Sequence, residues 1–201
     1  MPTLKGGDNP FSYLAAQFSS GVRIGLTGPS GTGKTTFARL LERVAQSTTH
    51  VEGAREWLQE HKVAEYWNMS PEDVARFELH ILSGFELDAD SNVFDRTTID
   101  ALFFATHSNA RLDLEDFERR AFAWVKRTID VLVFFPYRSE LFEDDGVRKN
   151  DPLYQLECAG FIVEKIVQHG MRSRLVVFMH HLSEEENIAR INETIAASAI
   201  G

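Results

Sequence analysis

Gly28-Pro29-Ser30-Gly31-Thr32-Gly33-Lys34-Thr35 is the stretch that decides the fold, because it fits the pattern G-x-x-x-x-G-K-[ST]. Residues 22–27 before it are typical of a short buried strand, and residues 36–44 after it place apolar side chains at helical spacing. Glycines let the backbone turn tightly and point successive N–H groups at an anion, and the helix adds the positive end of its dipole. The stretch therefore predicts a phosphate-binding loop for a nucleoside triphosphate, rather than a glycine-rich turn that binds nothing.

The pattern also assigns roles within this loop. We expect Lys34 to reach the β- and γ-phosphate oxygens as a catalytic residue, and the Thr35 hydroxyl to bind Mg²⁺. The sequence contains no N-K-x-D guanine signature, which favours ATP as the nucleotide. The expected nucleotide-binding residues are Gly28, Ser30, Gly31, Thr32, Gly33, Lys34, Thr35 and Thr36.

The composition is that of an ordinary globular protein, with 201 residues, 43% hydrophobic and 25% charged. Its formal net charge of −9 argues against a protein that wraps duplex DNA, although a local basic groove remains compatible with it. Cys158 is the only cysteine, so we expect a buried thiol and neither a disulfide framework nor a cysteine metal cluster. No membrane span or signal peptide is apparent, so we expect a cytoplasmic protein without a membrane partner.

Strand patterns alternate with helix patterns along the chain, which predicts one α/β domain. We expect a P-loop fold with a five-stranded, mostly parallel sheet in an order near 2-3-1-4-5, helices on both faces and a small flap. Residues 1–20 form an N-terminal extension with a short helix, and residues 21–201 form a single domain. The expected strands are residues 22–27, 47–52, 92–95, 129–135 and 174–179.

Asp95 and Arg96 follow the third predicted strand, and ligands of such sheets bind at the carboxyl ends of the strands. A carboxylate there can hold Mg²⁺ beside Thr35, or accept a proton from the acceptor. The alternative is that Asp95 only caps the helix that begins near Thr98. Arg96 could bind a phosphate or the acceptor through two parallel hydrogen bonds, or could simply form a salt bridge.

Glu52 ends the second predicted strand, with Arg55 one helical turn further on. A carboxylate at this position can face the acceptor hydroxyl and take its proton during phosphoryl transfer. The alternative is that acids in this first turn only complement the helix dipole. We therefore retain Glu52 as a candidate base and Arg55 as a candidate acceptor ligand.

A charged stretch, residues 143–149, follows the fourth predicted strand and contains Asp144, Asp145 and Arg148. Acids beside a glycine and then an arginine suit a flap that closes on the phosphates and excludes water. A solvated charged loop is the alternative interpretation.

Four segments of the sequence resemble the ribosylnicotinamide kinase domain of the bifunctional NAD-biosynthesis regulators and the related AAA-type ATPase/kinase domains. The resemblance covers about residues 21–197. Its segments are the loop 28–35; His50-Val51-Glu52-Gly53-Ala54-Arg55-Glu56, like W-E-x-x-R-E; Val93-Phe94-Asp95-Arg96; and Phe142-Glu143-Asp144-Asp145-Gly146-Val147-Arg148, like W-x-D-D-G-x-R.

The resemblance implies ATP- and Mg²⁺-dependent phosphorylation of a nucleoside-like hydroxyl, with Glu52, Asp95, Asp144, Asp145 and Arg148 at the site. Asp95-Arg96-Thr97 departs from the D-T-D of that family and is closer to the D-R of deoxynucleoside and thymidylate-type kinases. Viral relatives include kinases of 5-hydroxymethyluracil in DNA. The acceptor is thus left open among free nucleosides, nucleotides and a hydroxymethylated pyrimidine in DNA.

The sequence as a whole predicts a kinase in which Glu52 or Asp95 positions or deprotonates the acceptor hydroxyl. Arg148 would neutralise charge on the transferring phosphoryl group. The alternative function is a nucleotide-dependent switch or ATPase that acts on a protein partner and uses the same loop. The oligomeric state is not predicted.

Overall fold

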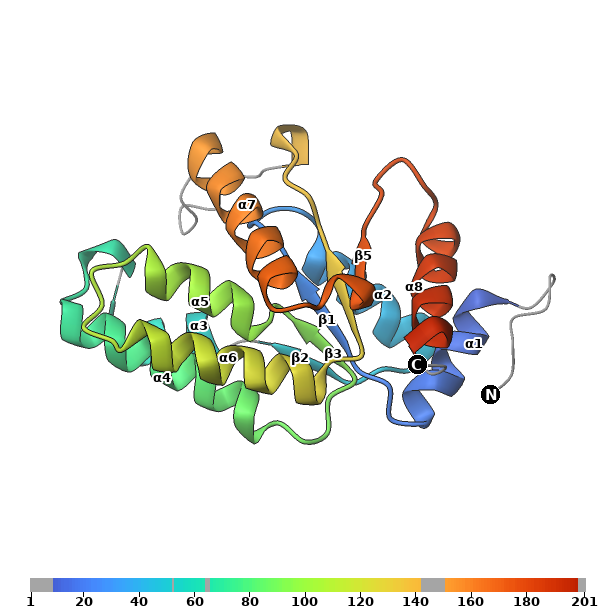
Figure 1. Ribbon diagram of the computed structural model, residues 1–201, viewed down its shortest axis with the longest axis horizontal. Coiled ribbons are helices and arrows are strands. Elements are labelled where there is room, and N and C mark those ends of the chain that lie inside the picture. Colours follow the sequence, from blue (N-terminus) through green and yellow to red (C-terminus); the bar gives the residue numbers. More distant parts are fainter. Residues whose placement is uncertain (1–8, 52, 64–65, 142–150, 199–201) are drawn as a thin grey trace.

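The central element of the computed structural model is a sheet of five parallel strands in the order β2-β3-β1-β4-β5 (Figure 1). This confirms the predicted strand order, and all pairings are parallel. The model describes residues 9–51, 53–63, 66–141 and 151–198. The strands are β1 (Ile24–Thr27), β2 (Thr49–Val51), β3 (Val93–Asp95), β4 (Val131–Phe134) and β5 (Leu175–Val177).

Helices lie before, between and after the strands along the chain. They are α1 (Pro10–Ser19), α2 (Lys34–Ala45), α3 (Ala54–Glu60), α4 (Pro71–Leu87), α5 (Thr98–Thr106), α6 (Leu114–Thr128), α7 (Pro152–Gln168) and α8 (Glu184–Ser198). Short 3₁₀ turns are η1 (Tyr66–Asn68), η2 (Ser139–Leu141) and η3 (Arg172–Arg174), of which η1 has no counterpart in the sequence patterns. Within the part of the chain that the structure describes, no helix is both long and apolar enough to span a bilayer.

Alternating side chains of the strands build two separate cores, one on each face of the sheet. In β4, Val131 and Val133 face α1, α2 and α8, whereas Leu132 and Phe134 face a larger cluster with α4 to α7. Figure 1 shows α1, α2 and α8 on one side of the sheet and α4, α5 and α6 on the other. Both faces are covered, which explains the nearly continuous apolar strands.

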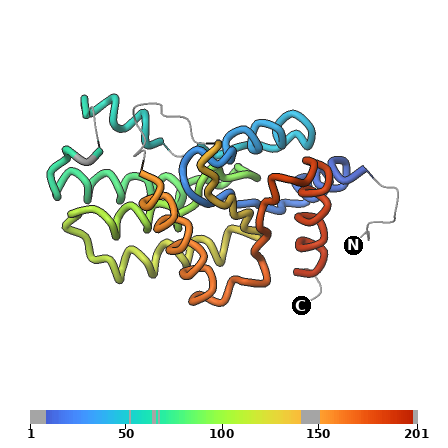
Figure 2. Tube along the Cα trace, turned by 90° about the horizontal axis from the view of Figure 1, so that it is seen from above, coloured from blue at the N-terminus to red at the C-terminus, as the bar shows by residue number. Residues whose placement is uncertain are grey.

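Helix α1 is part of the second core. Leu14 and Phe18 are buried in it, and the Asn192 side chain of α8 donates a hydrogen bond to the Pro10 carbonyl at 2.9 Å. The first and last helices therefore lie side by side, as both views show (Figure 2). The expected short N-terminal helix thus packs on the rest of the fold.

Leu14→Ala should lower the free energy of unfolding by about 3 kcal/mol, because it removes buried methyl groups and leaves a cavity. Leu87→Ala is the matched control, since the Leu87 side chain is 83% exposed, and it should change stability by less than about 0.5 kcal/mol. Urea denaturation of the three proteins measures both values. Equal stability of Leu14→Ala and wild type would contradict the packing of α1 on the domain.

Candidate active site

The predicted phosphate loop connects β1 to α2 at the carboxyl edge of the sheet. Gly28 has φ 133°, and a Cβ atom built on it would lie 2.3 Å from the Phe135 carbonyl oxygen, so only glycine fits there. Gly33, with φ 93°, immediately precedes α2 and has no side chain with which to cap the helix. The first-turn N–H groups of α2 can therefore bind an anion, as the sequence pattern predicted.

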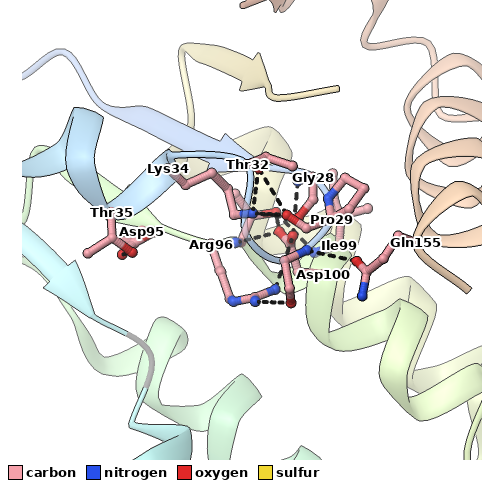
Figure 3. Close-up of polar contacts among 12 residues, drawn as sticks. Gly28, Pro29, Thr32, Lys34, Thr35, Asp95, Arg96, Ile99, Asp100 and Gln155 are labelled. Carbon is pink, nitrogen blue, oxygen red and sulfur yellow. Dashed lines mark hydrogen bonds and ion pairs between the residues drawn. The ribbon is translucent and has the colours of Figure 1, made fainter. Parts of the chain in front are cut away.

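The Lys34 side chain folds back over this loop and is buried (Figure 3). Its ammonium donates hydrogen bonds to the carbonyl oxygens of Gly28 at 2.7 Å and Pro29 at 2.5 Å, and to Thr32 Oγ1 at 3.3 Å. Burial, together with the nearby charge of Arg96, lowers the pKa of Lys34 to about 8. The ammonium is thus held by loop oxygens, at the position where phosphate oxygens can replace them.

Thr35 and Asp95 meet directly beside the loop. Thr35 Oγ1 donates a hydrogen bond to Asp95 Oδ2 at 2.6 Å, although the two residues lie 60 positions apart. The alternative role for Asp95 as a helix cap does not hold, because Thr97 caps α5 and accepts the Ile99 N–H. A hydroxyl and a carboxylate are the oxygen ligands that suit Mg²⁺.

The remaining ligands of such an ion would come from elsewhere. Among the described residues, no group of three or more His, Cys, Asp or Glu side chains is arranged to hold a metal ion. Mg²⁺ characteristically keeps several waters and binds through one or two protein oxygens plus substrate phosphates. Thr35 and Asp95 therefore fit Mg²⁺ that arrives with a nucleotide.

Arg96 has φ 90°, a left-handed conformation that is strained for any residue with a side chain. Its guanidinium donates a hydrogen bond to Ser30 Oγ at 3.0 Å, lies 3.8 Å from Asp100 Oδ1, and covers the Phe104 ring at 5.6 Å. The side chain is therefore directed toward the phosphate loop and forms the salt bridge considered from sequence, whereas its binding of a phosphate or the acceptor stays a prediction.

Two residues at the loop were not foreseen from the sequence. Asp100 Oδ1 accepts the Gly28 N–H at 3.1 Å, and Gln155 Oε1 of α7 accepts the Ser30 N–H at 3.0 Å. Thr97 followed three residues later by an acid is a recognisable capping pattern, so Asp100 had a local signal. Gln155 had none, because it lies 125 residues from its partner.

A cavity of about 330 Å³ has Phe104, whose ring contacts Arg96, in its wall and is lined mainly by aromatic and polar side chains. In its wall, the Tyr66 hydroxyl donates a hydrogen bond to Glu78 Oε1 at 2.7 Å, and Glu78 is almost fully buried. Burial, reinforced by the Glu78 charge, raises the pKa of Tyr66, which keeps the phenol a donor. The lining residues are Tyr66, Met69, Val74, Phe104, His107, Ser108, Asn109 and Tyr154.

A family model described as "AAA domain" matches residues 23–180, which is more than half of the chain. The chain belongs to this AAA-domain family. No curated protein matches it significantly.

Solved structures share the fold of this AAA domain at low sequence identity. The NadR protein in complex with NR has a TM-score of 0.64 and 22% identity, over 87% of this chain and 52% of its own. Deoxyadenosine kinase from M. mycoides with dCMP and dCDP bound has a TM-score of 0.60 and 15% identity, over 88% and 99%. Shikimate kinase from Acinetobacter baumannii in complex with shikimate has a TM-score of 0.59 and 15% identity, over 93% and 99%.

These structural similarities confirm the predicted P-loop fold and the predicted resemblance of the chain to the ribosylnicotinamide kinase domain. The chain spans about half the length of the NadR chain to which it is similar.

In the AAA domain, Lys34, Thr35, Asp95 and Arg96 lie close together at the phosphate loop. The sequence predicted this arrangement, because the loop and residues 95–96 follow strands whose carboxyl ends meet at one edge of the sheet. Arg55 lies in the first turn of α3 and is exposed, and Thr36 is exposed in the first turn of α2. Four other candidates lie outside the described residues and stay predictions: Glu52, Asp144, Asp145 and Arg148.

The lowered pKa of Lys34 predicts that nucleotide affinity falls at alkaline pH. Only the protonated ammonium attracts phosphate, and the free protein loses this proton as the pH rises through about 8. The Kd for ADP should therefore rise about tenfold per pH unit between pH 8.5 and 9.5, as isothermal titration calorimetry can measure. Lys34→Arg should bind more weakly but without this dependence, since a guanidinium stays protonated. A pH-independent wild-type Kd would contradict the assignment.

Proposed function

We propose that this protein is a kinase that transfers the γ-phosphoryl group of ATP, with Mg²⁺, to a hydroxyl of a nucleoside-type acceptor. The observation that carries the proposal is the 2.6 Å contact between Thr35 Oγ1 and Asp95 Oδ2, directly beside an open phosphate loop. A hydroxyl paired with a carboxylate at this point suits Mg²⁺ in P-loop proteins that cleave the γ-phosphate bond, and the cavity lined by Phe104 favours an acceptor molecule over water. The solved structures that share the fold and are named as kinases of small hydroxyl-bearing molecules support the proposal.

Each residue around the loop has a role in this reaction. The ammonium of Lys34 leaves the Gly28 and Pro29 carbonyls and binds the β- and γ-phosphate oxygens. Thr35 and Asp95 would hold Mg²⁺, directly or through water, and the bound ion would supply positive charge to the transferring group.

The chemical step joins the acceptor oxygen to the γ-phosphorus and breaks the bond between that phosphorus and the β–γ bridging oxygen, which leaves with ADP. The hydroxyl proton passes to a carboxylate, for which Glu52 and Asp95 are the candidates. The contact of Arg96 with Ser30 of the phosphate loop supports a role for its guanidinium at the γ-phosphate. Arg148 supplies further positive charge, and Asp144 and Asp145 bind the acceptor.

The cavity lined by Phe104 is the proposed acceptor site. Its volume of about 330 Å³ suits a ring-bearing small molecule, and its aromatic walls favour a planar ring. Phe104 joins the cavity to the phosphate loop, because its ring also contacts the Arg96 guanidinium. The net charge of −9 favours a free nucleoside or nucleotide over a pyrimidine within DNA.

Transfer of labelled γ-phosphate from ATP to a panel of acceptors tests the proposal. The panel contains nicotinamide riboside, deoxynucleosides, nucleotides, hydroxymethylated DNA and a small non-nucleoside alcohol, shikimate. We expect phosphorylation of one nucleoside-type class and none of shikimate, and a loss of at least a thousandfold in kcat in Lys34→Ala, with an unchanged circular dichroism spectrum. ATP hydrolysis that no acceptor stimulates but a protein partner does would contradict the proposal and favour a nucleotide-dependent switch.

Phe104→Ala should raise the KM of the acceptor about tenfold and the KM of ATP by no more than about threefold, because the ring is proposed to stack on the acceptor and supports Arg96 only through one contact with its guanidinium. Phe11→Ala is the matched control, since Phe11 is another partly buried phenylalanine but packs in the core on the opposite face of the sheet. Steady-state kinetics with each substrate varied separates the two constants. An unchanged acceptor KM would place the acceptor elsewhere.

A further inference from the structure

Asp100 lies in the first turn of α5, and its carboxylate is almost completely buried. Oδ2 accepts the Thr97 N–H at 2.8 Å and the Thr97 hydroxyl at 3.1 Å, which completes the capping box of α5. These two hydrogen bonds form a local capping motif that is common at the start of helices. It uses only one of the two carboxylate oxygens.

The second oxygen, Oδ1, has a different set of neighbours. It accepts the Gly28 N–H at 3.1 Å, from a residue 72 positions earlier, and lies 3.8 Å from Arg96 Nη1. Helix capping does not require either contact. The geometry of Oδ1 therefore connects α5 to the first residue of the phosphate loop (Figure 3).

Gly28 is fixed from three directions. Its N–H binds Asp100, its carbonyl accepts the Lys34 ammonium at 2.7 Å, and the Phe135 carbonyl blocks the position of a Cβ atom. The contacts of Gly28 with Asp100 and Phe135 remain when Lys34 moves onto phosphate, so the first residue of the loop stays in place, and such preorganisation contributes to affinity and rate.

Asp100 also balances the positive charge around the loop. The buried ammonium of Lys34 and the guanidinium of Arg96 repel each other, and Asp100 lies near both. A buried anion between two cations keeps both side chains in place.

We propose that Asp100 is a positioning residue for phosphoryl transfer, which holds Gly28 and Arg96 in the arrangement that binds the nucleotide phosphates. It acts through these two residues and does not itself contact the reacting atoms. This inference rests on the proposed function, which assigns the loop 28–35 to a nucleoside triphosphate.

Asp100→Asn tests the inference with a side chain of the same shape. Gly28 and Thr97 donate to different oxygens of the Asp100 carboxylate, so in the amide one of these two N–H groups faces an NH₂ donor and loses its acceptor. The negative charge beside Lys34 and Arg96 is lost in either orientation of the amide. We expect the Kd for ADP and for adenosine 5′-(β,γ-imido)triphosphate to rise at least tenfold, and kcat to fall at least tenfold. The acceptor KM should stay within threefold, since the cavity is intact.

Glu186→Gln is the matched control. Glu186 completes the capping box of α8 by accepting the Ser183 N–H at 2.7 Å, on a helix that packs on the opposite face of the sheet from α5. The same change from carboxylate to amide there should leave nucleotide affinity and kcat within twofold. Thermal unfolding of both variants measures the capping contribution separately.

Asp100→Asn with wild-type nucleotide affinity and kcat, whatever its unfolding temperature, would overturn the inference. A wild-type protein that binds ADP but phosphorylates no acceptor would overturn the proposed function, and the Kd of Asp100→Asn would then still decide the role of Asp100. If this variant does not fold, amide hydrogen exchange of Gly28 in nucleotide-free wild type decides. Slow exchange supports the bond to Asp100, and exchange at the rate of exposed amides overturns it.

Discussion

The parallel pairing of β1 with β3 is the constraint on which the site depends. Leu26 is paired with Asp95, so the two chains leave the sheet side by side at the same edge. The phosphate loop then lies beside residues 95–100, and Thr35 can reach Asp95. A crossover in which another strand lay between them would separate the hydroxyl from the carboxylate, and neither a metal site nor the contact of Asp100 with Gly28 could form.

Buried charge at this edge is arranged so that each group has a partner. Lys34 binds carbonyl oxygens of its own loop, and Arg96 lies between Ser30, Asp100 and the Phe104 ring. Isolated buried charges are costly, so these contacts hold the site together before any nucleotide is bound. The strained backbone at Arg96 fits the same interpretation, because strain persists only where the surroundings enforce it.

The fold was predictable because strong local patterns agreed with one another, whereas the site was predictable only in part. The glycine loop and the strand-end position of Asp95 each have a local signal, and the structure confirms both positions. The contact between Ser30 and Gln155 depends on how α7 packs across the sheet, which no local pattern contains. The cavity was missed for the same reason, since η1, α5 and α7 contribute its walls from distant parts of the chain.

A crystal structure with Mg²⁺ and adenosine 5′-(β,γ-imido)triphosphate tests the central claim most directly. We expect the β- and γ-phosphates within the loop 28–35, the Lys34 ammonium moved from the Gly28 and Pro29 carbonyls onto phosphate oxygens, and Mg²⁺ bound to Thr35 with Asp95 beside it. A nucleotide bound elsewhere, or a bound triphosphate with Lys34 still on those carbonyls and no ion between Thr35 and Asp95, would contradict the account.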